Sequence, residues 1–200
     1  MRQNTYLYFD EKSGEGVIID AGCSNADMKG ISAFISENNI SIKGILLTHG
    51  HYDHIIAIDE VKKITSAPVY SHEAEVRMLE NPDINLSSLR INKNLMVTPD
   101  HILKDGDVLQ LADTVLRILH IPGHTPGGVC YYDEKNGNLF TGDVLFKESI
   151  GRTDLPAGNH SELINNIAEK IMTLPDDTKA YPGHGSCTAV GHEKERNPFL

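Results

Sequence analysis

The stretch Thr48-His49-Gly50-His51-Tyr52-Asp53-His54 decides the fold, and it follows the apolar run Gly44-Ile45-Leu46-Leu47. Residues two apart project to the same side of an extended chain, so His49 and His51 can converge on one ion. Asp53 and His54 are expected at the turn that follows, where they can face a second ion. The alternative is a solvated polar loop that binds nothing.

A helix is predicted directly after this stretch, over residues 55–64. Its apolar positions 57, 58, 61 and 64 lie on one helical face. The four candidate ligands would therefore occupy a loop between a strand and a helix, which is a usual place for catalytic groups.

Three later segments each end a predicted strand with one more metal-ligand residue. The segments 119–127, 139–143 and 180–185 supply His124, Asp143 and His184, each directly after a glycine that lets the backbone turn tightly. With the first stretch they give five histidines and two aspartates. That is enough for two ions with an open position for water, which favours a metal-dependent hydrolase.

With these motifs the chain resembles the metallo-β-lactamase-fold hydrolases, whose signature is a His-x-His-x-Asp-His loop followed by a later His, Asp and His. The resemblance covers nearly the whole chain. The ligands that it implies are His49, His51 and His124 for a first ion, Asp53, His54 and His184 for a second, and Asp143 as the bridge. It further implies that Asp53 orients a hydroxide shared by both ions. Zinc is the expected metal, and iron and manganese are alternatives because His and Asp ligands accept all three.

Two further stretches are similar to the short, single-domain bacterial glyoxalase II class. They are residues 141–155 and the tail from Tyr181 to Leu200. This resemblance implies hydrolysis of hydroxyacylglutathione thioesters such as S-D-lactoylglutathione, which gives D-lactate and glutathione. Longer members carry a C-terminal helical domain that grips glutathione, whereas here residues 1–200 are expected to form a single domain without it. Arg152 is the candidate for a glutathione carboxylate, and its alternative role is an ion pair with Asp154.

Thioester chemistry suits the predicted site because a thiol of pKa about 8.5 leaves without a proton donor. The sequence offers no clear acid beside the ligands, which disfavours amides. The nearest rival is a glutathione persulfide dioxygenase with one iron on His49, His124 and Asp143. A lactonase remains possible. A β-lactamase is disfavoured by Asp143 and by the lack of a signal peptide, and a non-catalytic metal protein by the complete ligand set.

Strand and helix signals alternate along the chain and predict an α/β fold of the αββα type, with two mixed sheets flanked by helices. Asp20 ends one strand and is expected either to accept a hydrogen bond from a ligand histidine or to cap a turn. Residues 81–100 show no sustained period and are expected to be a cover over the substrate or a poorly ordered loop. The predicted strands are 6–9, 16–20, 44–48, 69–70, 108–111, 115–120, 129–132 and 139–141, with a two-residue hairpin turn at 136–137, and the predicted helices are 25–39, 72–79 and 159–174.

Composition limits the partners. The formal net charge of −10 opposes binding to nucleic acid, which needs clustered Lys and Arg. The start of the chain lacks a signal-peptide pattern and no stretch is long enough to span a membrane. Three cysteines without a Cys-x-x-Cys pair indicate reduced thiols. We expect a cytoplasmic enzyme that acts on a small-molecule thioester.

Overall fold

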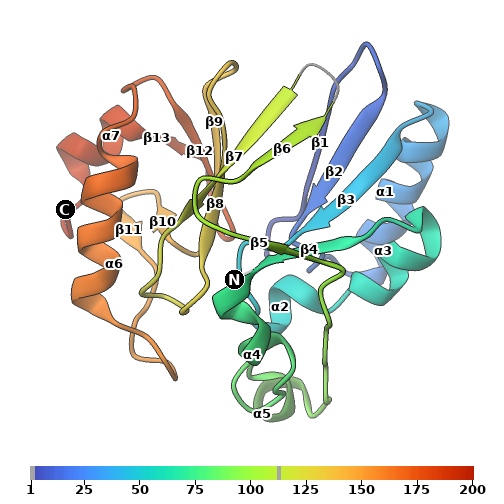
Figure 1. Cartoon of the computed structure of the whole chain (residues 1–200), viewed down its shortest axis with the longest axis horizontal. Helices are drawn as coiled ribbons and strands as arrows, with labels where there is room; N and C mark the ends of the chain where they lie inside the picture. Colours follow the sequence, from blue (N-terminus) through green and yellow to red (C-terminus); the bar gives the residue numbers. More distant parts are fainter. Residues whose placement is uncertain (1–2, 112–113) are drawn as a thin grey trace.

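The computed structural model describes residues 3–111 and 114–200. Two sheets face each other, with helices on the outer side of each (Figure 1). The first sheet has the order β1-β2-β3-β4-β5, formed by β1 (Tyr6–Phe9), β2 (Glu15–Ile19), β3 (Ser41–Leu46), β4 (Val69–His72) and β5 (His101–Leu103). Its strands are parallel except for β1, which pairs with β2 in the antiparallel sense.

The second sheet has the order β13-β12-β9-β8-β7-β6. Only the pair of β12 with β9 is parallel. A separate hairpin of β10 with β11 lies beside it. The strands are β6 (Val108–Leu111), β7 (Thr114–His120), β8 (Val129–Asp133), β9 (Asn138–Gly142), β10 (Leu145–Phe146), β11 (Ser149–Ile150), β12 (Lys179–Pro182) and β13 (Thr188–Ala189).

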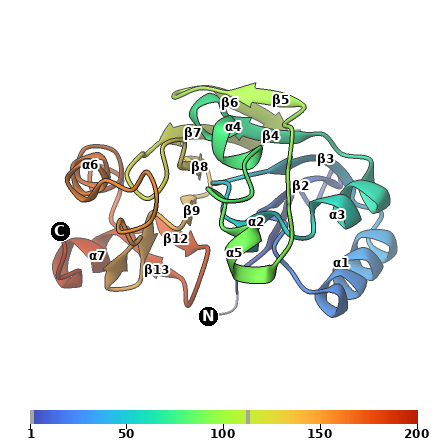
Figure 2. The same ribbon diagram turned by 90° about the horizontal axis from the view of Figure 1, so that it is seen from below.

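The helices fall into three groups. In Figure 1, α1 (Asn25–Glu37) and α3 (Ile58–Thr65) cover the outer face of the first sheet, while α6 (His160–Asn166) and α7 (Val190–Arg196) cover the second. The short helices α2 (Tyr52–Ile55), α4 (Val76–Leu79) and α5 (Ser87–Ile91) lie at the lower end of the sandwich in Figure 1, which is the side that faces the viewer in Figure 2. None of the helices in the described ranges has the length and apolar character needed to cross a bilayer.

Side chains alternate along the strands and so build three apolar layers. On β2, Val17 and Ile19 point between the two sheets, where they meet Leu116 and Tyr131, whereas Ile18 points toward α1 and α3. A third cluster lies between the second sheet and α6. The period of two in a sheet that is buried on both faces fixes which side chains face which layer. The predicted αββα fold is confirmed.

Several local predictions need correction. The helix expected over 55–64 is broken at 56–57, so Asp53 and His54 lie in the single turn of α2 and not in a loop. The hairpin loop between β8 and β9 has four residues and not two, because the Asp133 carboxylate accepts the Asn136 N–H and widens the turn. The helix expected over 159–174 begins as predicted, with Asn159 as its cap, but continues from Ile167 as a π-helical turn.

Hydrogen bonds connect the segment 81–100 to the rest of the fold. The segment contains α5, and the buried Asn85 side chain donates to the Leu95 carbonyl oxygen at 2.9 Å, while the Asn85 backbone carbonyl oxygen accepts the Tyr52 N–H at 2.9 Å. These bonds fasten the segment to itself and to α2, which carries two of the predicted ligands.

Candidate metal centre

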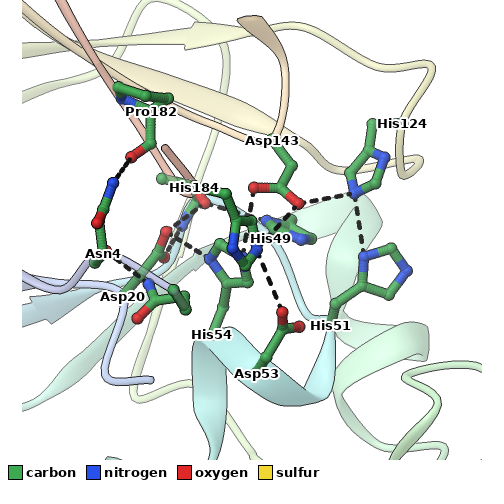
Figure 3. A network of polar contacts seen from close by, with 12 residues as sticks. Asn4, Asp20, His49, His51, Asp53, His54, His124, Asp143, Pro182 and His184 are labelled. Atoms are coloured by element: carbon green, nitrogen blue, oxygen red, sulfur yellow. Dashed lines mark hydrogen bonds and ion pairs between the residues drawn. The ribbon is translucent and has the colours of Figure 1, made fainter. Parts of the chain in front are cut away.

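The seven predicted ligand residues come together at one end of the sandwich, where strands of both sheets end (Figure 3). His49 and His51 follow β3, and Asp53 and His54 lie on α2. The remaining three come from the second sheet, with His124 before β8, Asp143 after β9 and His184 after β12.

Two groups of ligand atoms are close enough to share an ion. The first is His49 with His51 and His124, and the second is Asp53 with His54 and His184, each with its ligand atoms within 4.8 Å of one another. In the first group, His51 Nδ1 lies 3.0 Å from His124 Nε2. In the second group, Asp53 Oδ2 lies 3.2 Å from His184 Nε2. The spacing fits the grouping that the sequence predicted.

Asp143 lies between the two groups. Its Oδ2 is 3.8 Å from His124 Nε2 of the first group and 3.6 Å from His184 Nε2 of the second. Its Oδ1 is 3.4 Å from His54 Nε2. A carboxylate in this position can offer one oxygen to each of two ions.

Asp20 fixes the orientation of two of these histidines. Its Oδ2 accepts from His54 Nδ1 at 2.8 Å and from Thr48 Oγ1 at 2.7 Å, while its Oδ1 accepts from Thr48 N at 2.8 Å. Thr48 Oγ1 in turn lies 3.1 Å from His49 Nδ1. Since Thr48 donates to Asp20, it accepts from His49. Both imidazoles then carry a proton on Nδ1 and turn Nε2 toward the centre.

Of the two roles that the sequence left open for Asp20, the structure supports the hydrogen bond to a ligand histidine. Its oxygens also come within 4.8 Å of His49 and His54 ligand atoms, near enough to suggest a third metal group. Both oxygens, however, already accept hydrogen bonds from Thr48 and His54. We therefore regard Asp20 as a residue that orients ligands and not as a ligand.

His124 is oriented by the backbone. Its Nδ1 lies 2.7 Å from the Arg152 carbonyl oxygen, which can only accept, so Nδ1 carries the proton and Nε2 faces the centre.

The donor atoms of the centre fit metal ions. Among the described residues, Nε2 of His49 and His54 and Oδ1 of Asp143 are buried in the centre without a hydrogen-bond partner. Buried polar atoms are rarely left unsatisfied, and three in one place call for an explanation. Imidazole nitrogens and carboxylate oxygens together suit zinc, iron or manganese. The cluster can therefore bind a metal, and two ions are plausible.

The protonation of most of the imidazoles supports this. Burial, followed by the neighbouring imidazoles, places the pKa of His49 well below its usual value and lowers the pKa of His51 to about 3. Burial also lowers the pKa of His124. These rings are neutral at physiological pH, which is the form that binds a metal.

His54 differs in the metal-free protein. Burial acts to lower its pKa, but the carboxylates of Asp143 and Asp20 raise the pKa well above its usual value on balance. The protonated His54 then supplies the positive charge beside the two buried carboxylates. In the metal-bound protein a metal ion would supply positive charge at this place instead.

Two glycines let the ligands approach each other. Gly142 has φ of 49°, a left-handed conformation that glycine adopts without strain, and it turns the chain from β9 into Asp143. Gly183 acts differently from the prediction, because it is required for space and not for a positive φ. A Cβ there would lie 2.3 Å from Asp143 Oδ1 and 2.6 Å from His54 Cε1.

The centre forms one side of a cavity of about 620 Å³. That is within the range of sites that hold small molecules. Arg152 lines the cavity, and its guanidinium also forms a two-pronged ion pair with Asp154, with both contacts at 2.7 Å. Two other cations, Arg90 of α5 and Lys147 of the β10–β11 hairpin, line it as well. These two were missed from the sequence, because nothing local distinguishes them from surface cations.

Glu75 is another residue that the sequence did not single out. Its buried carboxylate accepts the Gly50 N–H at 2.8 Å and the Gly127 N–H at 2.7 Å. Gly50 lies between His49 and His51 in the first ligand loop, and Gly127 lies in the loop that carries His124. Glu75 thus ties two ligand loops together through their backbones.

The comparisons with known proteins agree with this geometry. Residues 1–184 match the family model described as the metallo-beta-lactamase superfamily. The probable metallo-hydrolase YqgX of Bacillus subtilis is 38% identical over 194 residues, which cover 96% of this chain and 90% of the relative. The hydroxyacylglutathione hydrolase GloC of Haemophilus influenzae is 34% identical over 201 residues, which cover 100% and 93%.

Solved structures show the same family. The crystal structure of the B3 metallo-beta-lactamase BLEG-1 has a TM-score of 0.91 and 40% identity, covering 99% of this chain and 94% of that one. The structure of TTHA1623 in a di-iron-bound form has a TM-score of 0.84 and 32% identity, covering 99% and 95%. The predicted family is confirmed. The chain belongs to the metallo-β-lactamase superfamily and is a metallo-hydrolase of that superfamily.

Proposed function

We propose that the protein hydrolyses an anionic thioester, with S-D-lactoylglutathione as the first candidate substrate. The observation that carries this proposal is a pair of ligand groups joined by Asp143 on one side of a cavity whose wall also holds Arg90 and Lys147. The similarity to a hydroxyacylglutathione hydrolase supports the substrate class.

In this proposal His49, His51 and His124 would hold one ion, Asp53, His54 and His184 a second, and Asp143 would touch both. When bound, the ions lower the pKa of water from about 15.7 to about 7 and polarise the carbonyl oxygen of the substrate. Zinc is our first expectation. Iron is the alternative, supported by the similarity to a protein crystallised in a di-iron-bound form.

Asp53 would orient the attacking water. Burial acts to raise the pKa of Asp53, but the hydrogen bond from His184 and the neighbouring His54 lower it on balance, so the carboxylate is ionised and accepts hydrogen bonds. It lines the cavity, where substrate and water meet. A thiolate leaving group needs little help from a proton donor. This suits the cavity, whose titratable lining residues are mainly the histidines and carboxylates of the predicted ligand set and the three cations.

The cations would bind the charged end of the substrate. Arg90 and Lys147 form no ion pair among the described residues, whereas Arg152 is held by Asp154. In a protein of net charge −10, free cations at a cavity favour an anionic ligand. Glutathione thioesters carry two carboxylates and an α-amino group. We therefore propose Arg90 and Lys147 as substrate-binding residues, and Arg152 as a third that exchanges Asp154 for a substrate carboxylate.

We expect the cytoplasm as the compartment. Cys23, Cys130 and Cys187 are free thiols, and thiols stay reduced in that compartment.

The proposal is tested by measuring metal content and thioester turnover on the same purified sample. We expect two ions per chain and release of free thiol from S-D-lactoylglutathione, and we expect His184→Ala to lose one ion together with turnover. His101→Ala is the matched control, because His101 is an exposed histidine that stacks on Tyr70 in β4 and lies outside the cluster. One iron per chain, with oxygen uptake on glutathione persulfide and no hydrolysis, would replace the hydrolase by a dioxygenase.

A second candidate, β-lactam hydrolysis, is favoured by the 40% identity to the B3 metallo-beta-lactamase BLEG-1. The same centre would attack a strained lactam, whose amide nitrogen needs a proton when it leaves. Turnover of nitrocefin under the conditions of the thioester assay distinguishes the two. A ratio of kcat/KM that favours nitrocefin would reverse our assignment.

A further inference from the structure

One wall of the cavity is the short hairpin β10–β11, which contributes Phe146, Lys147, Ser149 and Ile150 to the lining. Each of its strands has two residues, and only two residue pairs join them. An isolated hairpin of that size is not stable on its own. Something outside the hairpin must therefore hold it where the substrate would lie.

The turn of the hairpin is held by a buried carboxylate on α7. Glu193 has no exposed surface, and its Oε2 accepts the Glu148 N–H at 2.9 Å. The same oxygen accepts from Asn197 Nδ2 at 2.8 Å, and Oε1 accepts from Thr188 Oγ1 at 2.5 Å. Asn197 Nδ2 also donates to the Ser149 carbonyl oxygen at 3.1 Å. Glu193 and Asn197 thus hold the backbone of Glu148 and Ser149, the two residues that follow Lys147.

This arrangement has a free-energy cost, because it combines an unfavourable backbone conformation with a buried carboxylate. Glu148 has φ of 55°, a left-handed conformation that is unfavourable for a residue with a side chain. Glu193 is a buried carboxylate that, among the described residues, contacts no lysine or arginine, and His192 is 4.0 Å away. Burial of a charge is tolerated only where hydrogen bonds satisfy it, as the three donors do here. Val190 of α7 is already buried in the apolar cluster of the second sheet and α6, so the carboxylate is not needed to hold α7 to the sheet.

We infer that Glu193 is a positioning residue that sets where Phe146 and Lys147 meet the substrate. It acts through the Glu148 backbone and through Asn197, and it touches neither the substrate nor the predicted metal ligands. The expected effect on catalysis rests on the proposed function, in which Lys147 is a substrate-binding residue. Glu193 would therefore determine substrate affinity and selectivity, and would leave the metal centre unchanged.

The test is Glu193→Gln, with Glu195→Gln as the matched control on the exposed side of the same helix. The NH₂ of the amide faces either Thr188, whose hydroxyl then has to accept, or Glu148 N and Asn197 Nδ2, which cannot accept. In the first case the two bonds that hold the hairpin become neutral and weaker, and in the second case both are lost. The first measurement is amide hydrogen exchange. We expect the Glu148 and Ser149 amides to exchange at least about tenfold faster in Glu193→Gln, with β7 and β8 unchanged.

The second measurement is steady-state kinetics on the metal-loaded enzyme. We expect KM for the thioester to rise about tenfold with kcat within a factor of about two, and the metal content to stay the same. Asn197→Ala serves where Glu193→Gln does not fold, since it removes the bond to Ser149 and leaves the carboxylate in place.

The two measurements separate the inference from the proposed function. Unchanged exchange at Glu148 and Ser149, or a loss of protection spread over the whole chain, overturns the positioning role even if thioesters are hydrolysed. A fall in kcat or metal content at constant KM also overturns it. If the wild-type protein hydrolyses no thioester, the exchange experiment still decides whether Glu193 holds the hairpin, and kinetics move to the substrate that is turned over.

Discussion

Replacing Asp20 by Asn would change the protonation of a predicted metal ligand without removing any ligand. In the wild-type protein both Asp20 oxygens accept, which keeps the proton of His54 on Nδ1 and leaves Nε2 free for an ion. Asn can accept with one atom only. If its NH₂ faces His54, the ring must accept at Nδ1 and carry its proton on Nε2, which then points a hydrogen toward the second ion.

The magnitude follows from the three hydrogen bonds that Asp20 accepts, at 2.8, 2.7 and 2.8 Å. If the NH₂ faces Thr48 N instead, a buried donor is left unsatisfied at a cost of about 1–3 kcal/mol. If it faces His54, loss of the oriented ligand reduces metal affinity by about 10–100-fold, which corresponds to about 1.4–2.8 kcal/mol. Only the orientation that faces His54 acts directly on the second ion, since in the other orientation the remaining oxygen still accepts from His54 Nδ1.

The assay is competition for the metal between the protein and a chromophoric chelator, which gives a dissociation constant for each of the two ions. Urea unfolding of the metal-free protein gives the change in stability separately. Asp59→Asn is the control, because Asp59 is an exposed aspartate on α3 outside the cluster. We expect that control to match the wild type in both measurements.

Two results would refute this reasoning. If Asp20→Asn binds both ions within about twofold of wild type, the tautomer of His54 does not depend on Asp20. If both ions weaken equally, the effect is a general loosening of the site and not a change at His54.

Three further predictions concern other parts of the structure. Gly183→Ala places a Cβ 2.3 Å from Asp143 Oδ1, so elemental analysis should find less than two ions per chain while circular dichroism stays unchanged. Tyr131→Phe removes the 2.7 Å hydrogen bond to the Leu47 carbonyl oxygen, and urea unfolding should show a loss of about 1–2 kcal/mol. Burial raises the pKa of Glu75 from 4.5 to about 7, so the folded state holds a proton that the unfolded state has released. The contribution of Glu75 to the free energy of unfolding of the metal-free protein should therefore be highest below pH 4.5. It should fall by up to about 3 kcal/mol as the pH rises through 7. Urea unfolding across that range should give a flatter profile for Glu75→Gln.

The ligand set could be predicted because its signals are local. The first four candidate ligands lie within six residues of one another after a predicted strand, and each of the later three directly follows a glycine at the end of a predicted strand. The loops that follow the strands of a sandwich lie at the same edge of the fold. Metal-ligand residues in several of these loops are therefore expected to cluster in space. The structure brings all of these residues together, although their binding of metal remains a prediction.

The residues that orient the ligands could not be predicted in the same way. Glu75 contacts Gly50 and Gly127, which are 25 and 52 residues away in the chain. Its own neighbourhood reads as an ordinary helical segment, and no local pattern indicates its partners. Asp20 was singled out only because it ends a strand, and the choice between its two roles needed the position of His54.

Boundaries of local structure were predicted less well than the elements themselves. The apolar period over 55–64 continues through the break at 56–57, since Ile55 before it and Ile58 after it are both buried. The Ala57 N–H bonds to the Ala21 carbonyl oxygen at 2.8 Å, a tertiary contact that interrupts the helix. The apolar periodicity of the sequence does not indicate a tertiary hydrogen bond of that kind.

The N-terminal segment of the chain meets the loop that carries His184. The Asn4 N–H donates to the Gly183 carbonyl oxygen at 2.7 Å, and Asn4 Nδ2 donates to the carbonyl oxygens of Pro182 and Gly185. During synthesis the first of these partners leaves the ribosome long before the last. His49 and His51 are then available for an ion while His184 is still to be made, so an early ion can be held by only part of the final ligand set. Arrival of His184 would therefore complete the predicted ligand set, and the same loop pairs with the N-terminal segment, in one late step of folding.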